Sequence, residues 1–267
     1  MIRARLGRDL AGPGAAMALV ALVLLGRRLA PYDPERPVAV PWAPPSSKAP
    51  LGADALGRDV FSRTLSGGAH LLTVSLAAAA VALLCGVALG LAAGWGTAAV
   101  SRAVRWGCDL LLAVPALVLA LVLAVALPGA MAIVVASVLS GAPLTARVVG
   151  ARCASVRDSG YVRAAVERGE RTPSVLVREL LPAVSGLVAA DAGLRLVTAL
   201  QLATALAVLG LGPQPPAPDW ALMLSENLPG AALNPAALLG PAVSLALTAW
   251  LLASAARTAG RHLGGAA

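Results

Sequence analysis

Long apolar runs separated by short polar segments dominate the hydrophobic pattern of this chain. Six runs are candidates for membrane spans, because a helix needs about 20 mostly apolar residues to cross a bilayer. We place them at approximately 11–25, 71–95, 106–127, 130–144, 183–209 and 236–253. The first run is short, and the stems of flanking arginines can extend it by snorkelling. The pattern predicts an all-α membrane protein with six transmembrane helices.

The first apolar run has an alternative interpretation as a secretory signal peptide. Its basic start, with Arg3, Arg5 and Arg8, fits that interpretation. However, the run ends in Gly26-Arg27-Arg28 and not in a small-x-small cleavage site. We therefore favour a first membrane helix that is retained.

The polar segment after the first run divides into two parts. Seven prolines between positions 31 and 50 exclude a helix there and indicate an extended, solvent-facing segment. Residues 51–70 alternate apolar positions at near-helical spacing with Asp54, Arg58, Asp59 and Arg63. We predict a short amphipathic helix that lies at the membrane surface.

Small and charged residues within the spans indicate how the helices associate. Gly86, Gly90 and Gly94 recur every fourth residue, so they share one face and allow another helix to approach closely. Asp109, near the start of the third span, is expected to cap the helix or lie at the interface, because an acid at a helix N-terminus is favoured by the dipole; the alternative is a proton relay.

The fifth span contains two charges, Asp191 and Arg195, one helical turn apart. Such a spacing allows an intrahelical ion pair, and charges in a bilayer should face the bundle interior or a pore. The pair is either structural or part of a transport pathway. The candidate pathway-lining residues of this span are Asp191, Arg195, Thr198 and Gln201.

Composition supports a membrane protein and orients it. The chain is 58% hydrophobic and 13% charged, with a mean hydropathy of +0.81. The net charge of +8 is spread between apolar runs and not gathered in one patch, so no nucleic-acid partner is predicted. Six spans put both termini on one side, where the segments carry fourteen basic residues against six on the other. The positive-inside rule therefore predicts that both termini are cytoplasmic.

Several kinds of chemistry find no support in the sequence. Cys85, Cys108 and Cys153 lack metal-like spacing and are expected to be packing residues, and the single His70 of the 51–70 segment is not expected to bind a metal. No glycine-rich loop precedes Lys48, the only lysine, so the chain has no Walker A motif. We predict no catalytic residue, no metal ligand and no ATPase activity in this chain.

The stretch from Gly160 to Pro182 is the most charged interruption between apolar runs, with seven charged side chains. Asp158 or Ser159 can cap a short helix that runs through Arg168, and Gly169 can end it in a left-handed conformation. Thr172-Pro173 is a strong start signal for a second helix. The sequence therefore predicts a cytoplasmic knob of two short helices that meet at Gly169.

Three stretches resemble the second permease subunit of the peptide and nickel family of ABC importers. They are LAPYDP with LGADALGRDVFSRTLSGGAH from 29 to 70, the loop 161–182, and GLGPQPPAPDWALML from 210 to 224. The resemblance implies a type I ABC importer permease fold, in the bacterial cytoplasmic (inner) membrane, with a coupling helix that docks on an ATPase. It places this ATPase-coupling role on Tyr161, Arg163, Ala164, Ala165, Glu167, Arg168, Gly169, Thr172 and Pro173.

The resemblance also implies partners and cargo. A second, related permease subunit, two cytoplasmic ATPase subunits that bind ATP and Mg²⁺, and an extracytoplasmic substrate-binding protein would complete the importer. The chain itself would hold no cofactor. The expected cargo is a di- or oligopeptide, with nickel or a metal chelate as the alternative. An ion-coupled secondary transporter that uses Asp191 and Arg195, or a membrane scaffold, are rival interpretations.

On this basis we divide the chain into four parts. These are the cytoplasmic N-terminus with the first helix (1–30), the extracytoplasmic segment (31–70), the permease core (71–256) with its coupling loop (158–182), and a cytoplasmic tail (257–267).

Three positions depart from the family pattern. Arg163 stands where importers generally have Glu, Glu179 where an aliphatic residue is preferred, and Ala203 where an acidic residue is frequent.

Overall fold

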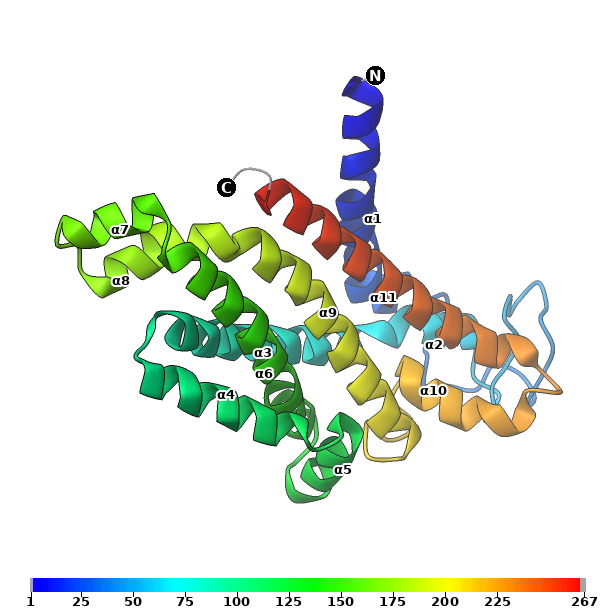
Figure 1. Cartoon of the computed structure of the whole chain (residues 1–267). Helices are drawn as coiled ribbons and strands as arrows, with labels where there is room; N and C mark the ends of the chain where they lie inside the picture. Colours follow the sequence, from blue (N-terminus) through cyan, green and yellow to red (C-terminus); the bar gives the residue numbers. More distant parts are fainter. Residues whose placement is uncertain (1, 265–267) are drawn as a thin grey trace.

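The computed structural model describes residues 2–264, and their side chains from Gly14 onwards. Five helices of 28 to 30 residues dominate it (Figure 1). They are α1 (Ile2–Leu29), α3 (Gly68–Trp95), α6 (Ala130–Arg157), α9 (Leu181–Val208) and α11 (Pro235–Gly264). The shorter helices are α2 (Val60–Ser66), α4 (Ala98–Leu112), α5 (Ala116–Ala126), α7 (Gly160–Glu167), α8 (Thr172–Val175) and α10 (Trp220–Asn227). The apolar runs of the sequence thus fold as helices.

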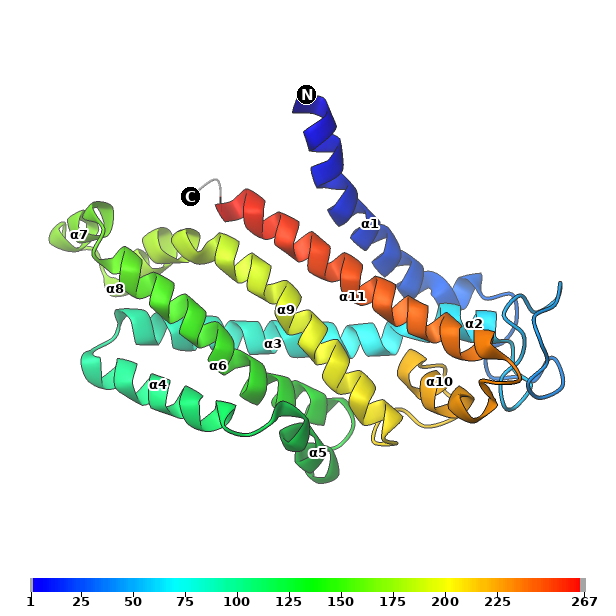
Figure 2. The same ribbon diagram turned by 45° about the vertical axis from the view of Figure 1, so that its right-hand side comes forward.

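The bundle has two different ends (Figure 2). The short helices α7 and α8 project from one end, and the C-terminal part of α11 lies toward the same end. The other end carries the non-helical segment 30–59 and the helix α10. We call this second end the cap, defined by residues 30–66 and 210–235.

Four helical stretches among the described residues are long and apolar enough to cross a membrane. They are Val60–Trp95, Ala130–Arg157, Thr172–Val208 and Pro235–Gly264, and the bent pair α4 and α5 makes a fifth if it is counted as one span. The all-helical membrane protein is confirmed, whereas the predicted total of six spans is not.

The third predicted span is not a single helix. It begins earlier than expected, at Ala98, and α4 and α5 meet at an angle of 82° across Ala113, Val114 and Pro115. Proline lacks a backbone N–H and disfavours helical geometry in the residue before it, so the chain breaks at this point. Asp109 therefore lies in the last turns of α4, and Thr97 is the N-cap, so the predicted capping role of Asp109 is wrong.

The fourth predicted span ends too early, because α6 continues past Leu144 to Arg157. Pro143 lies inside this helix without ending it. Arg147, in the added part, forms an ion pair with Asp109 of α4. Both partners are partly exposed, and their pairing ties α4 against α6.

The expected amphipathic surface helix at 51–70 is wrong in two respects. Residues 51–59 form turns and isolated bridges, and only Val60 to Ser66 are helical before α3 begins at Gly68. Asp54, Arg58, Asp59 and Arg63, expected on a solvent-facing side, are each at most 1% exposed. The segment is a buried part of the cap and not a helix lying on the membrane.

The predicted glycine face of α3 is confirmed as the contact with α6. A Cβ added to Gly90 would lie 2.7 Å from the Cβ of Val149 and 3.0 Å from the carbonyl oxygen of Ala146. Gly86 lies against Thr145 and Gly94 against Cys153 in the same way. This close approach makes α3 and α6 the most extensive helix pair of the bundle. Cys153 is fully buried within an apolar cluster, as expected of a packing residue.

Candidate functional site

The first candidate site is the pair of helices α7 and α8, which we call the knob (residues 158–182). Ser159 is the N-cap of α7, although its side chain makes no capping hydrogen bond, and Gly169 follows the helix with a φ of +76°. The next helix starts at Thr172 with Pro173 in its first turn. The predicted turn at Gly169 is confirmed. The second helix is not short, because it continues through a π-helical turn at Leu176–Leu180 into α9.

Few buried contacts hold the knob to the bundle. Val162 and Ala165 of α7, with Val175 and Leu180 of the second helix, are at most 1% exposed and pack with Val184 of α9 and Val156 of α6. The knob therefore rests on the ends of α6 and α9. A force on it would act on both of these membrane-crossing helices.

Most of the predicted coupling residues face solvent. Tyr161, Arg163, Glu167, Arg168, Gly169, Thr172 and Pro173 are exposed, Ala164 is half-buried and Ala165 is buried. A hollow of about 240 Å³ beside α7 is lined by Trp95, Arg157, Asp158, Arg163, Val166 and Glu167. The guanidinium of Arg157 lies 5.3 Å from the centre of the Trp95 ring, in cation–π range.

Charged side chains of the knob pair with each other. Arg168 donates to Glu170 at 2.8 Å, and this hydrogen bond holds the pKa of the Glu170 carboxyl below its usual range. Arg163, which stands where importers generally have Glu, lies 3.4 Å from Asp158. Arg163 thus forms an exposed ion pair with an acid at the start of the loop.

The second candidate site surrounds the fifth predicted span. The predicted ion pair is present, because Arg195 Nη2 lies 3.1 Å from Asp191 Oδ1. The two side chains are 7% and 10% exposed. Asp191 also accepts a hydrogen bond from the hydroxyl of Thr145, and Arg195 Nη1 donates to the carbonyl oxygen of Gly141 at 3.3 Å. The pair therefore joins α9 to α6.

Three of the four predicted pathway residues line one hollow. It has a volume of about 350 Å³ and lies between α5, α6 and α9, and we call it the α9 hollow. Arg195, Thr198 and Gln201 of α9 contribute to its wall, together with Ser140 of α6 and apolar side chains such as Leu117, Leu144 and Leu202. Asp191 pairs with Arg195 but does not line the hollow.

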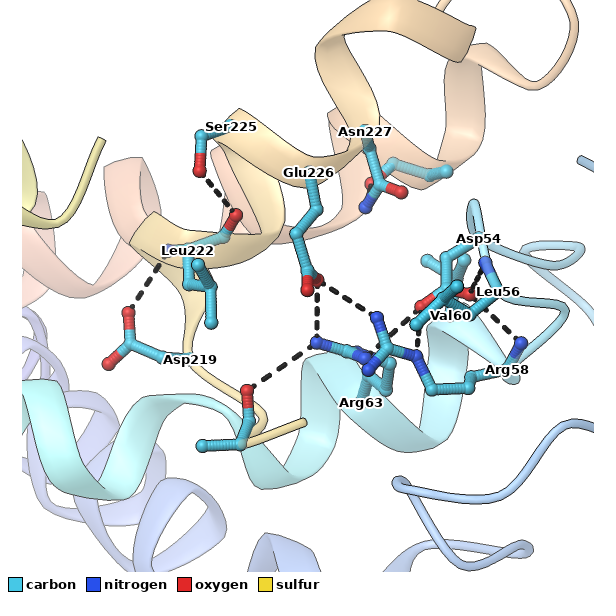
Figure 3. Close-up of polar contacts among 12 residues, drawn as sticks. Asp54, Leu56, Arg58, Val60, Arg63, Asp219, Leu222, Ser225, Glu226 and Asn227 are labelled. Carbon is cyan, nitrogen blue, oxygen red and sulfur yellow. Dashed lines mark hydrogen bonds and ion pairs between the residues drawn. The ribbon is translucent and has the colours of Figure 1, made fainter. Parts of the chain in front are cut away.

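A third cluster, which the sequence reasoning missed, is a buried network of ion pairs in the cap (Figure 3). Arg58 Nε lies 2.7 Å from Asp54 Oδ2, and Arg63 Nη1 lies 3.2 Å from the same oxygen. Glu226 of α10 reaches both arginines, at 3.1 Å from Arg58 Nη2 and 2.8 Å from Arg63 Nη2. The network thus fastens the 51–66 segment to α10, about two thirds of the chain away.

Neighbouring contacts reinforce this junction. Asp219 caps α10 by accepting from the backbone N–H groups of Ala221 and Leu222, at 2.9 and 3.2 Å. Trp220 Nε1 donates to the carbonyl oxygen of Thr64 at 2.6 Å. Asn234 donates to three carbonyl oxygens of the segment 43–53. Burial raises the pKa of Glu226, and the adjacent Arg58 opposes that rise.

A sequence signal for this network was available. Asp54 and Arg58, like Asp59 and Arg63, are four residues apart, and Glu226 is one of two acids in the cap after residue 210. This spacing predicts an exposed helix face, because charged side chains are usually solvated. Their partner lies beyond four intervening apolar runs, so the spacing did not indicate it.

Comparisons with known proteins agree with these features. Residues 86–264 match the family of binding-protein-dependent transport system inner membrane components. The glutathione transport system permease protein GsiD of Pectobacterium atrosepticum is 31% identical over 235 residues, which cover 87% of this chain and 78% of that protein. GsiD of Escherichia coli is 31% identical over 241 residues, covering 86% and 77%. The chain therefore belongs to the binding-protein-dependent inner membrane components, as a multi-pass permease of the peptide and nickel family of ABC importers and not its ATPase.

Proposed function

We propose that the chain forms half of the translocation pathway of an importer for di- or oligopeptides. The names of its relatives support the cargo class, because they are permeases of a glutathione transport system. The exposed knob is the observation that carries the proposed role, because it presents a charged surface for docking at the ends of two long helices. The second half of the pathway is a related permease subunit.

In the proposed topology the chain crosses the bacterial inner membrane six times, with both termini and the knob in the cytoplasm. The spans are α1, α2 with α3, the bent pair α4 and α5, α6, α8 with α9, and α11. The distribution of basic residues supports this orientation, because the sequence assigns fourteen of them to the segments on the side of the knob and six to the segments on the side of the cap. The cap then faces the extracytoplasmic binding protein.

The knob docks on one of two cytoplasmic ATPase subunits, which bind ATP and Mg²⁺. The exposed side chains Tyr161, Arg163, Glu167 and Arg168 make this contact, and the hollow beside Trp95 receives part of the partner. When the ATPases close on ATP, they move the knob as a rigid body. Because the knob rests on α6 and α9, its movement tilts the helices that hold Asp191 and Arg195. The α9 hollow then alternates between the two sides of the membrane.

The test replaces Gly169 with valine in the complex reconstituted with its partner subunits. A β-branched residue is strained at a φ of +76°, so the turn between the two knob helices changes shape. We expect ATP hydrolysis stimulated by the loaded binding protein to fall to the unstimulated rate, while the permease still inserts and assembles. Stimulated hydrolysis at the wild-type rate would contradict the coupling role.

Gly210→Val is the matched control. Gly210 has a φ of +79° and, like Gly169, has no atom within 4 Å of an added Cβ, but it lies in the cap. The two variants therefore impose similar backbone strain at opposite ends of the molecule. We expect Gly210→Val to retain stimulated hydrolysis.

A second variant separates docking from folding of the knob. Val166 is 49% exposed on α7, so Val166→Asp leaves the buried contacts of Val162 and Ala165 in place. We expect this variant to co-purify with the partner permease but to lose the ATPases. Full retention of the ATPases would exclude this face of α7 from the docking surface.

A further inference from the structure

The guanidinium of Arg195 is only partly used by the protein. Nη2 donates to Asp191 and Nη1 to the carbonyl oxygen of Gly141, but Nε is buried without a hydrogen-bond partner. An unpaired buried donor is costly, and a charged donor especially so. Arg195 also forms part of the wall of the α9 hollow. The guanidinium of Arg195 therefore reaches the hollow, and the carboxylate of Asp191 that pairs with it does not.

The other polar groups of the hollow complement this cation. The hydroxyls of Ser140 and Thr198 donate to backbone carbonyl oxygens of their own helices, at 2.7 and 2.9 Å. Each hydroxyl proton is therefore used, and the oxygen can only accept a further hydrogen bond. Gln201 adds an exposed amide. Among the described residues that line the hollow, none is acidic. The wall therefore combines one cation with acceptors for N–H groups, which suits a molecule with both a carboxylate and amide groups.

Size and depth also fit a small peptide. A volume of about 350 Å³ lies within the range of small-molecule sites, and the apolar side chains of Leu117, Leu144 and Leu202 can accept aliphatic groups. Arg195 is thirteen residues before the end of α9, which places it roughly 20 Å along the helix at 1.5 Å per residue. In the proposed topology this places Arg195 within the bilayer, whose hydrocarbon core is about 30 Å thick.

We propose that Arg195 recognises a carboxylate group of the peptide cargo and that Asp191 is a positioning residue, which holds the guanidinium toward the hollow. This inference rests on the proposed peptide-import function. Arginine suits the role because its planar fork can bind a carboxylate while other donors stay engaged with the protein. A purely structural ion pair would not discriminate between cargo with and without a carboxylate.

The experiment compares import of trialanine with import of its C-terminal amide. The permease complex is reconstituted in vesicles with saturating binding protein, whose own affinity for each peptide is measured separately by calorimetry. For the wild type we expect the free acid to enter about tenfold faster at equal binding-protein occupancy, which corresponds to one charge-assisted hydrogen bond. Equal import of both peptides by the wild type would overturn the proposal.

The decisive variant is the double substitution Asp191→Asn and Arg195→Gln. It removes both buried charges together, so no unpaired charge remains to unfold the helix pair. We expect the preference for the free acid to fall to within about twofold, a difference of less than one hydrogen bond. A double variant that keeps the wild-type preference would show that Arg195 is only structural.

Two further variants complete the test. Arg195→Lys keeps the charge without the fork, and we expect it to keep part of the preference. Arg147→Gln removes an exposed arginine from α6 outside the hollow, and we expect no change in preference. A wild-type complex that hydrolyses ATP in response to its loaded binding protein but imports neither peptide would overturn the proposed cargo, and this inference with it.

Discussion

At the scale of single residues, the cap is held together by charges in an apolar chain. Arg58 and Arg63 are at most 1% exposed, and each contacts both Asp54 and Glu226. The charges of the two arginines and the two carboxylates balance, which lowers the free-energy cost of burying them. Removal of one member leaves an excess charge with little access to water, because only the side chain of Glu226, 13% exposed, reaches the surface.

We predict that Arg63→Gln destabilises the protein by about 3–5 kcal/mol, the cost of breaking a buried pair. Asp54 and Glu226 would then share only Arg58. Unfolding in detergent can be followed by tryptophan fluorescence, because Trp220 lies in this junction and bonds to Thr64. The variant should unfold at lower temperature or denaturant concentration.

Arg36→Gln is the control for this prediction. Arg36 pairs with Asp33 at 3.2 Å in the same cap, but its side chain is 82% exposed. An exposed pair contributes about 1 kcal/mol or less. Similar stability of the two variants would mean that the buried network contributes no more than a surface ion pair.

At the scale of helices, the bundle depends on the close contact of α3 with α6 and on the break between α4 and α5. The glycine face of α3 was readable from the sequence because it depends only on the helical period. The break between α4 and α5 was not, although Pro115 lies at it. Pro143 and Pro241 lie inside α6 and α11, which continue through them. A proline in the sequence therefore does not by itself predict that a helix breaks there.

We predict that Gly90→Val separates α3 from α6. The added Cβ would overlap Val149, and overpacking a close helix contact costs about 1–3 kcal/mol. The melting temperature of the detergent-solubilised protein should fall, as measured by size-exclusion chromatography after heating.

Gly107→Val is the matched control on α4, where no atom lies within 4 Å of an added Cβ. Its melting temperature should stay near that of the wild type. An equal loss in both variants would attribute the effect to helix propensity and not to the contact between α3 and α6.

At the scale of the whole molecule, the two ends of the bundle have different constructions. The knob has exposed charges and a few buried apolar contacts. The cap has buried charges, and its loops are tied by the side chain of Asn234. The exposed, charged knob suits reversible docking. The cap, whose segments are joined by buried ion pairs and hydrogen bonds, suits a stable surface.

The proposed orientation predicts which end chemical labels can reach. In a background without the three native cysteines, a cysteine at the exposed position Lys48 should react with a membrane-impermeant maleimide in spheroplasts. A cysteine at the exposed position Arg168 should react only in inside-out vesicles. The reverse pattern would put the knob outside the cytoplasm and exclude docking on an ATPase.

The sequence by itself determined the features that depend on neighbouring residues. The apolar runs predicted where helices lie, although not their ends. The spacing of Gly86, Gly90 and Gly94 predicted a packing face, and Gly169 before Thr172-Pro173 predicted the turn of the knob. Each follows from local backbone preference or from the cost of exposing polar groups to lipid.

Only the tertiary structure decided what the polar residues contact. The sequence predicts that Arg58 and Arg63 are solvated. In the folded chain they are buried against Glu226, which is 168 and 163 positions away from them. The hollow beside Arg195 likewise exists only because α5, bent away from α4, meets α6 and α9. The physical reason is that the free energy of a charge depends on all the groups that surround it, and distant segments supply those groups.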